Sequence, residues 1–165
     1  MLSTTGGLYE ARVLQVLSVL QMSLARRRLE RGDGGLDLVG EWKDLCRVGV
    51  QCKHRCSALR RRTVQVSVVR ELEASVQRWK SDAGSPSVFL GVMASNALLS
   101  RDAQRWFHGS LQPLAYVCID DLSRLTSFRL NLEAGRNLPR VSALKRESTR
   151  GNNVAVIIDE EIYEF

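Results

Sequence analysis

Apolar residues in the first part of the chain recur at helical spacing. Over residues 8–23 they lie three or four positions apart, which predicts an amphipathic helix. Glu10 projects along the middle of that apolar stripe, and an inward carboxylate is costly unless something compensates its charge. A partly hydrated acid in the first turn, stabilised by the helix dipole, explains the same residue equally well. The same spacing predicts two further helices, at residues 63–80 and 100–108.

A stretch with a period of two follows the first helix. It predicts an antiparallel hairpin with strands at residues 36–42 and 47–54. Alternation places Gln51 and Lys53 on one face of the second strand. Pairing of the two strands can bring Asp37 to that same face, so we expect these three side chains to lie close together.

Helices and strands alternate along the chain, which predicts an α/β (α+β) fold with a central mixed sheet flanked by helices. Nearly continuous apolar runs at residues 87–94 and 114–119 are typical of strands buried on both faces. We expect the main domain to cover residues 1–120. The pattern weakens in residues 121–165, which we interpret as a C-terminal extension that packs on or trails the domain and begins with a helix at 121–132.

Composition adds a basic surface to this picture. The chain has 165 residues, of which 44% are hydrophobic and 25% charged, as in an ordinary globular protein. The formal net charge is +6, which suits a phosphate backbone but also suits a solvated surface. Two arginine triplets concentrate the charge and are the candidate nucleic-acid-binding residues: Arg26, Arg27 and Arg28, and Arg60, Arg61 and Arg62.

Several classes of protein are disfavoured by the sequence. No run approaches the ~20 apolar residues of a membrane-spanning helix. The helical pattern starts almost at Met1, so we expect either no targeting segment or a processed chain. The spacing of the four cysteines does not suggest a framework of disulfide pairs, which predicts a reducing, intracellular compartment. A zinc site is disfavoured because three ligands in a row on one strand face cannot surround a tetrahedral ion; its candidate ligands are Cys46, Cys52, His54 and Cys56.

The hairpin carries the residue types that phosphodiester hydrolysis needs. Mg²⁺ or Mn²⁺ prefers oxygen ligands, which Asp37, the amide of Gln51 and the backbone carbonyl of Cys52 offer. Lys53 could orient the nucleophile or meet the phosphate, and Glu10 could hold a water molecule of the cation. A buried polar network uses the same residue types, so spacing alone does not decide between the two interpretations.

Four motifs carry a resemblance to a known family: G-x-x-Y-E at residues 6–10, G-D-G-G-L-D-L at 32–38, V-Q-C-K at 50–53 and V-R-E-L-E at 69–73. Together they resemble the Mrr-type restriction endonuclease domain, the branch of the PD-(D/E)xK nucleases in which glutamine replaces the middle acid. The Q-C-K-H and E-L-E segments look most similar to the fungal mitochondrial "required for respiratory growth" nuclease-like proteins. Ala74 departs from the glycine that the family often has at that position. The resemblance covers about residues 6–120.

The resemblance implies a metal-dependent DNA endonuclease with a restriction-endonuclease-like fold. Asp37, Gln51 and Lys53 would form the core of the site, with Glu10 as the helical acid and Mg²⁺ or Mn²⁺ as the cofactor. The fungal similarity implies mitochondrial genome maintenance. The sequence leaves the oligomeric state open, and a homodimer is one of the states that it allows. The main alternative is a catalytically inactive DNA-binding or assembly module that keeps the fold, and a purely structural interaction domain is a third interpretation.

Three other groups of residues are expected to be structural. We predict that Glu71 and Glu73 lie on the exposed side of the second helix, away from the site. Trp42 and Trp106 are expected to pack in the core, although both could stack on bases. His54 is expected at the surface or at a sheet edge, because no serine or cysteine nucleophile has a matching context.

Overall fold

The computed structural model describes residues 5–27, 35–55, 63–82, 88–148 and 151–165. The described helices are α1 (Thr5–Val19), α2 (Val66–Asp82), α3 (Arg101–Gly109) and α4 (Leu132–Asn137). The described strands are β1 (Met22–Arg26), β2 (Leu38–Trp42), β3 (Cys46–Lys53), β4 (Phe89–Ser95), β5 (Leu114–Ile119), β6 (Leu125–Leu130), β7 (Val141–Ser148), β8 (Gly151–Ile158) and β9 (Glu161–Glu164).

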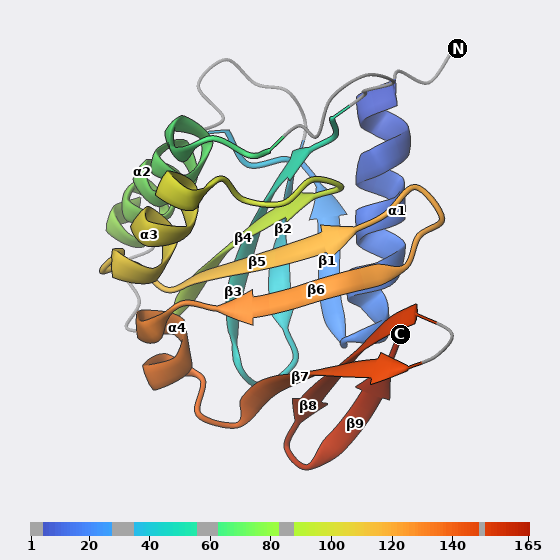
Figure 1. Cartoon of the computed structure of the whole chain (residues 1–165). Helices are drawn as coiled ribbons and strands as arrows, with labels where there is room; N and C mark the ends of the chain where they lie inside the picture. The colour runs from blue at the N-terminus through green and yellow to red at the C-terminus, as the bar shows by residue number, and fades with distance from the viewer. Residues whose placement is uncertain (1–4, 28–34, 56–62, 83–87, 149–150) are drawn as a thin grey trace.

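A six-stranded mixed sheet forms the centre of the molecule, in the order β1-β2-β3-β4-β5-β6 (Figure 1). β1, β2 and β3 pair antiparallel, and β3, β4 and β5 pair parallel. Parallel neighbours need a crossover connection, which α2 supplies between β3 and β4 and α3 supplies between β4 and β5. The predicted fold class, a mixed sheet flanked by helices, is therefore confirmed.

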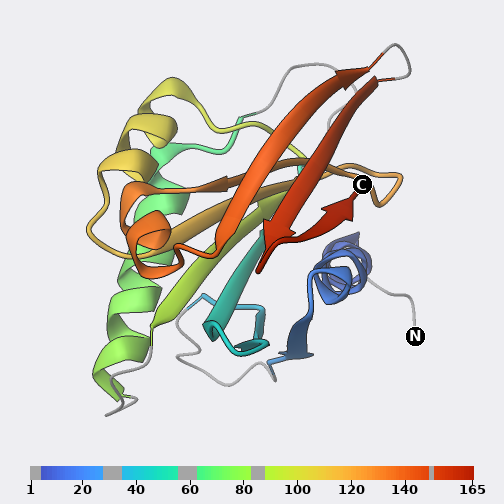
Figure 2. The same ribbon diagram turned by 90° about the horizontal axis from the view of Figure 1, so that it is seen from below.

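The two faces of the sheet bury different helices (Figures 1 and 2). α1 packs on one face, where Val48 and Val50 of β3 join its apolar stripe in one core cluster. α2 and α3 pack on the other face, in a cluster that includes Leu72 and Phe107. The period of two in β3 thus directs alternate side chains to opposite layers, which fixes the face to which its polar residues point.

Trp42 anchors the α1 side of the core. Its side chain is fully buried, its ring lies 6.1 Å from that of Phe128, and its indole N–H donates to the carbonyl of Leu20 at 2.7 Å. A buried indole needs such an acceptor, and this one ties the end of β2 to the end of α1. The expected core packing of Trp42 is confirmed.

The segment after residue 120 differs from the prediction. A helix was expected at residues 121–132, but β6 runs antiparallel to β5 there and extends the main sheet. The reason is a tight turn in which Asp120 accepts the backbone N–H groups of Leu122 and Arg124, while Ser123 adopts a positive φ of 62°. An aspartate that satisfies backbone donors locally favours a turn over a helix.

A second, three-stranded sheet, in the order β7-β8-β9, packs on the same face as α1 (Figure 2). Val141 and Val156 from this sheet belong to the α1-side core cluster. The hydroxyl of Tyr163 also contacts the amide of Gln21, next to the turn after α1. Residues beyond 120 therefore cover part of the main core, and the division into a domain and an extension stays a prediction. None of the helices in the described part of the chain has both the length and the apolar character needed to cross a membrane.

Candidate active site

The β2–β3 hairpin holds Asp37 beside the end of β3. The ladder between the two strands ends at the pair Leu38 and Val50, and Asp37 lies just beyond it. The backbone N–H of Asp37 donates to the carbonyl of Val50 at 2.8 Å, and its carboxylate Oδ2 accepts the N–H of Cys52 at 2.6 Å. This second bond is charge-assisted and fixes the orientation of the carboxylate at the end of the hairpin.

Asp37 reaches this place because the chain bends there, which the alternation pattern did not predict. Alternation through the predicted strand at residues 36–42 would place Leu36 and Leu38 on one face, but Leu36 belongs to the α2-side core and Leu38 to the α1-side core. Regular strand geometry therefore begins after Asp37. Gly35, with a positive φ of 77°, precedes this bend, and such a backbone conformation favours glycine.

Gln51 is buried without a hydrogen-bonding partner. Its side chain is 1% exposed, and neither Oε1 nor Nε2 has a partner. Leaving a buried polar group unsatisfied costs about 1–3 kcal/mol, so a well-packed glutamine in this state calls for an explanation. A ligand that bonds to the amide of Gln51 would provide that explanation.

Lys53 contacts a residue that the sequence did not assign to the site. Its Nζ lies 3.7 Å from Oε2 of Glu71 on α2. Glu71 was expected to be exposed and away from the site; it is exposed, but it pairs with the lysine. Ser75, one turn further along α2, is fully buried although polar and donates its hydroxyl to the carbonyl of Glu71 at 2.9 Å. The sequence carried no local signal for the approach of Glu71, because it depends on how α2 packs beside β3.

Gly35 makes room for this group of side chains. A Cβ built at this glycine would lie 3.1 Å from Oε1 of Glu71 and 3.4 Å from Nε2 of Gln51. Both atoms are therefore adjacent to the same point of the backbone. Residues from β3, α2 and the segment before β2 thus converge on the side of the sheet that α2 covers.

Glu10 reaches the site from the opposite layer. Burial raises the pKa of its carboxyl, the negative charge of Asp37 raises it further, and Arg26 opposes both effects. The guanidinium Nε of Arg26 lies 3.8 Å from Oε2 of Glu10. The carboxylates of Glu10 and Asp37 are therefore within electrostatic reach of each other.

Both cysteines of this hairpin are held in an environment that favours the neutral thiol. Burial and the negative charges of Asp37 and Glu10 raise the pKa of the Cys52 thiol well above its ordinary value, so the thiol is neutral. Burial also raises the pKa of Cys46, to about 12. Both cysteines, and Cys118, are free. Cys56 of the disfavoured zinc site lies outside the described residues.

Of the predicted nucleic-acid-binding arginines, the structure describes Arg26 and Arg27. Arg26 lies at the site, where its Nη2 also donates to the carbonyl of Gly7 at 2.7 Å. The guanidinium of Arg27 lies 4.8 Å from the ring centroid of Trp79. Four of the predicted residues lie outside the described part of the chain: Arg28, Arg60, Arg61 and Arg62.

The donor set fits a hard cation better than zinc. Within the described ranges, no three His, Cys, Asp or Glu side chains gather in a way that could hold a metal ion. Two carboxylates, those of Asp37 and Glu10, and the unpartnered amide of Gln51 remain as oxygen donors. Oxygen donors with room for water suit Mg²⁺ or Mn²⁺, and the buried, unpaired amide is the observation that fits a bound cation.

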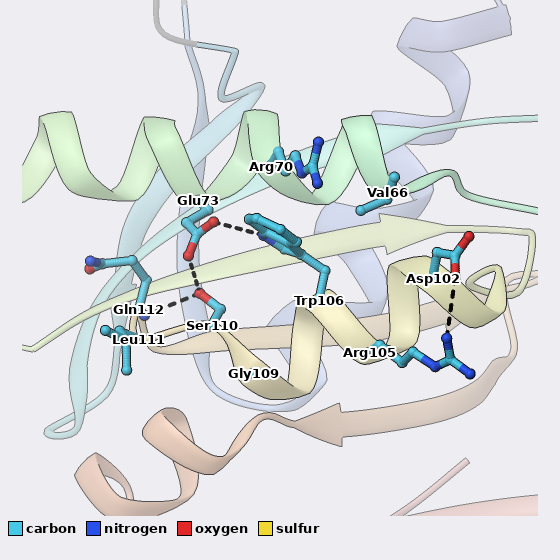
Figure 3. A pocket seen from close by; sticks show the side chains of 10 residues that line it. All are labelled: Val66, Arg70, Glu73, Asp102, Arg105, Trp106, Gly109, Ser110, Leu111 and Gln112. Atoms are coloured by element: carbon cyan, nitrogen blue, oxygen red, sulfur yellow. Dashed lines mark hydrogen bonds and ion pairs between the residues drawn. The ribbon is translucent and has the colours of Figure 1, made fainter.

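A separate cavity of about 650 Å³ lies between α2 and α3 (Figure 3). Trp106 forms one wall, with the guanidinium of Arg70 4.0 Å from its ring centroid. Glu73 accepts the indole N–H of Trp106 at 2.8 Å and the hydroxyl of Ser110 at 2.5 Å. Trp106 is 39% exposed, so its expected core packing is wrong. The cavity is lined by none of the predicted site residues.

Comparison with known proteins agrees with this geometry. The Mrr catalytic-domain family, described as a restriction endonuclease, matches residues 3–126. A crystal structure of a repair endonuclease from Pyrococcus abyssi is similar in fold, with a TM-score of 0.52 and 17% sequence identity. The similarity covers 71% of this chain and 48% of that one, so the chain spans about half of the structure it resembles. A search of curated proteins found no significant match. The family match extends over most of the chain, which therefore belongs to the Mrr-type restriction endonuclease family.

Proposed function

We propose that this protein is a DNA endonuclease that hydrolyses phosphodiester bonds with Mg²⁺ or Mn²⁺. The observation that carries the proposal is the buried amide of Gln51, which has no partner and precedes Cys52, the residue whose N–H donates to the Asp37 carboxylate. A family whose members are described as restriction endonucleases supports the same activity.

The cation would be held by Asp37, the amide oxygen of Gln51 and the backbone carbonyl of Cys52. When bound, it withdraws charge from the phosphoryl oxygens and makes water a better nucleophile. The N–H of Cys52 keeps the Asp37 carboxylate in a fixed orientation, so no reorganisation is needed when substrate arrives. Glu10 adds a second carboxylate from α1 that can accept a proton or orient water.

Lys53 would meet the scissile phosphate or orient the nucleophile. Its ammonium is held 3.7 Å from the Glu71 carboxylate, which restricts where it can point. A positively charged group that is already oriented stabilises developing negative charge more effectively than a mobile one. Glu71 thereby acts on the reaction through the lysine.

Cleavage assays on duplex and single-stranded DNA, with Mg²⁺, Mn²⁺ or EDTA, test this proposal. Asp37→Ala should lower the rate by at least about 100-fold, as expected when a main electrostatic contact is lost. Asp44→Asn is a matched control, because Asp44 lies in the turn at the other end of the same hairpin and has a positive φ of 54° that asparagine tolerates. Wild-type activity that survives in Asp37→Ala would refute the assignment of Asp37.

The second candidate is a catalytically inactive DNA-binding or assembly module. It is favoured by the observation that the described residues bring no group of three metal-binding His, Cys, Asp or Glu side chains together. This function predicts salt-dependent DNA binding with no cleavage under any metal condition. Isothermal titration with Mn²⁺ distinguishes the two functions. A nuclease should bind Mn²⁺ and lose this binding in Asp37→Ala, whereas an inactive module requires no cation site.

We also propose a setting in mitochondrial genome maintenance, which rests on the similarity of the Q-C-K-H and E-L-E segments to the fungal nuclease-like proteins. Subcellular fractionation followed by immunodetection of the full-length protein tests this. Exclusive recovery outside mitochondria would refute the setting without affecting the nuclease proposal.

A further inference from the structure

A second group of charged side chains lies beside the candidate active site. Nη1 of Arg12 and Nε2 of His54 both contact the same oxygen, Oδ1 of Asp121, at 3.3 and 3.0 Å. An ionised carboxylate can only accept hydrogen bonds, so Nε2 of His54 carries the hydrogen. Two donors from different elements thus converge on one anionic oxygen.

The group is at the same edge of the sheet as the hairpin site. His54 directly follows Lys53 at the carboxyl end of β3, and Asp121 follows the carboxyl end of β5. β3, β4 and β5 are parallel, so these ends meet at one edge, and the β5–β6 turn lies next to α1 (Figure 1). Ligands of open α/β sheets bind at this edge.

His54 is held from several sides. The Tyr9 ring lies 5.0 Å from the imidazole of His54, and its hydroxyl donates to the carbonyl of Ile119 at 3.2 Å. Ser95 donates to the carbonyl of Lys53 at 2.7 Å, and the side chain of Asn96 accepts the N–H of Arg55 at 2.8 Å. The backbone on both sides of His54 is therefore anchored to the end of β4.

Asp121, in contrast, is held loosely. Its side chain is 69% exposed, whereas the side chains of Arg12 and His54 are 27% and 17% exposed. The turn that carries it is fixed by its neighbour Asp120, not by Asp121 itself. Surface ion pairs contribute little to stability, so the Asp121 carboxylate can leave the pair of donors at small cost.

We propose that Arg12 and His54 form a binding site for a backbone phosphate of DNA, and that Asp121 occupies it in the free protein. The site rests on the proposed function, because it assumes a DNA substrate bound across this edge. A phosphate oxygen takes the place of Asp121 Oδ1 between the guanidinium and the imidazole. Arg12 lies on α1, the helix that carries Glu10, and His54 follows Lys53 at the carboxyl end of β3, so the bound phosphate lies at the same edge of the sheet as the candidate active site.

This arrangement makes Asp121 a competitor of the substrate. Its removal lets the phosphate bind without displacing a carboxylate and also removes a like charge. Exposed ion pairs of this kind are weak, so we expect Asp121→Asn to tighten DNA binding about two- to five-fold. Arg12→Gln should weaken binding and reduce the slope of log K against log salt by about 0.9, the loss of one phosphate contact.

Fluorescence anisotropy of a labelled duplex in EDTA tests the site without cleavage. Asp159→Asn is the matched control: it also removes one negative charge, from an exposed turn carboxylate paired with an arginine at 3.0 Å in the second sheet. We expect tighter binding for Asp121→Asn and no comparable change for Asp159→Asn. In the double variant Arg12→Gln/Asp121→Asn the gain should disappear, because the carboxylate competes only for an intact site.

Two results would overturn the inference while leaving the nuclease proposal intact: equal affinities of Asp121→Asn and Asp159→Asn, or weaker binding by Asp121→Asn. The second result would mean that Asp121 positions His54 for substrate. An unchanged salt slope in correctly folded Arg12→Gln, checked by circular dichroism, would likewise exclude the phosphate contact. If the wild-type protein binds no DNA at any salt concentration, the proposed function itself fails.

Discussion

Replacing Gln51 with methionine should make the protein more stable and inactive at once. The two side chains have similar volume, and the 1% exposed glutamine has neither amide atom paired. Methionine removes two buried unsatisfied atoms, so we expect the free energy of unfolding to rise by about 1–3 kcal/mol. For a domain of this size each kcal/mol corresponds to about 2–4 °C in Tm, which differential scanning calorimetry in EDTA resolves.

The cation dependence of stability should disappear in the same variant. A ligand present at 100 times its Kd stabilises the folded state by about 2.7 kcal/mol. Wild-type protein should therefore show a Tm that rises with Mn²⁺, whereas Gln51→Met should not, and its cleavage activity should be lost. Gln104→Met is the matched control, because Gln104 donates to the carbonyl of Leu99 at 3.0 Å and its replacement loses a hydrogen bond. A lower Tm for Gln51→Met in EDTA, or unchanged cleavage, would refute the reasoning.

Three further predictions concern the frame around the site. Trp42→Ala should lower the free energy of unfolding by about 3–5 kcal/mol in urea titrations, because it leaves a large cavity and an unpaired Leu20 carbonyl. Gly35→Ala should cost about 1–2 kcal/mol for its positive φ and reduce cleavage further than this loss of stability explains, because the new Cβ presses on Glu71. The pKa of Asp120 is lowered, since burial, which raises it, is outweighed by hydrogen bonds from Arg124 and Leu122. Its stabilisation is therefore present at neutral pH and lost as the pH falls below 3.8 through the lowered pKa, so the Tm difference between wild type and Asp120→Ala should shrink in acid.

The parts of the fold that the sequence predicted are those with strong local signals. The apolar run at residues 114–119 coincides with β5, and the predicted helix at residues 100–108 coincides with α3, which Ser100 caps by accepting the N–H of Ala103. The period of two correctly placed Gln51 and Lys53 together. These features depend on neighbours within one element, and the local pattern is therefore sufficient to predict them.

The features that the sequence missed depend on residues far apart in the chain. Leu36 lies on the other face from the one that alternation predicts, because the bend at Asp37 breaks the alternation. This bend occurs where the pairing between β2 and β3 ends. Glu71 approaches Lys53 only because α2 crosses back over the end of β3. A helix was predicted at residues 121–132, where the structure has β6. Pairing with β5, closed by the Asp120 turn, outweighs the weak local preference of this segment.

Several unusual features of the described structure meet around the candidate active site, and their combination bears on function more directly than any single residue. Buried side-chain atoms without partners occur at Gln51, Arg55 and Gln112 among the described residues, and the first two lie on either side of Lys53. The raised pKa of the Glu10 carboxyl and the positive φ of Gly35 fall at the same site. Proteins tolerate such departures where a ligand or a reaction compensates them. A purely structural interaction domain would have no reason to concentrate an unsatisfied amide, two neighbouring carboxylates and a backbone constraint within one hairpin and the helices that cover it.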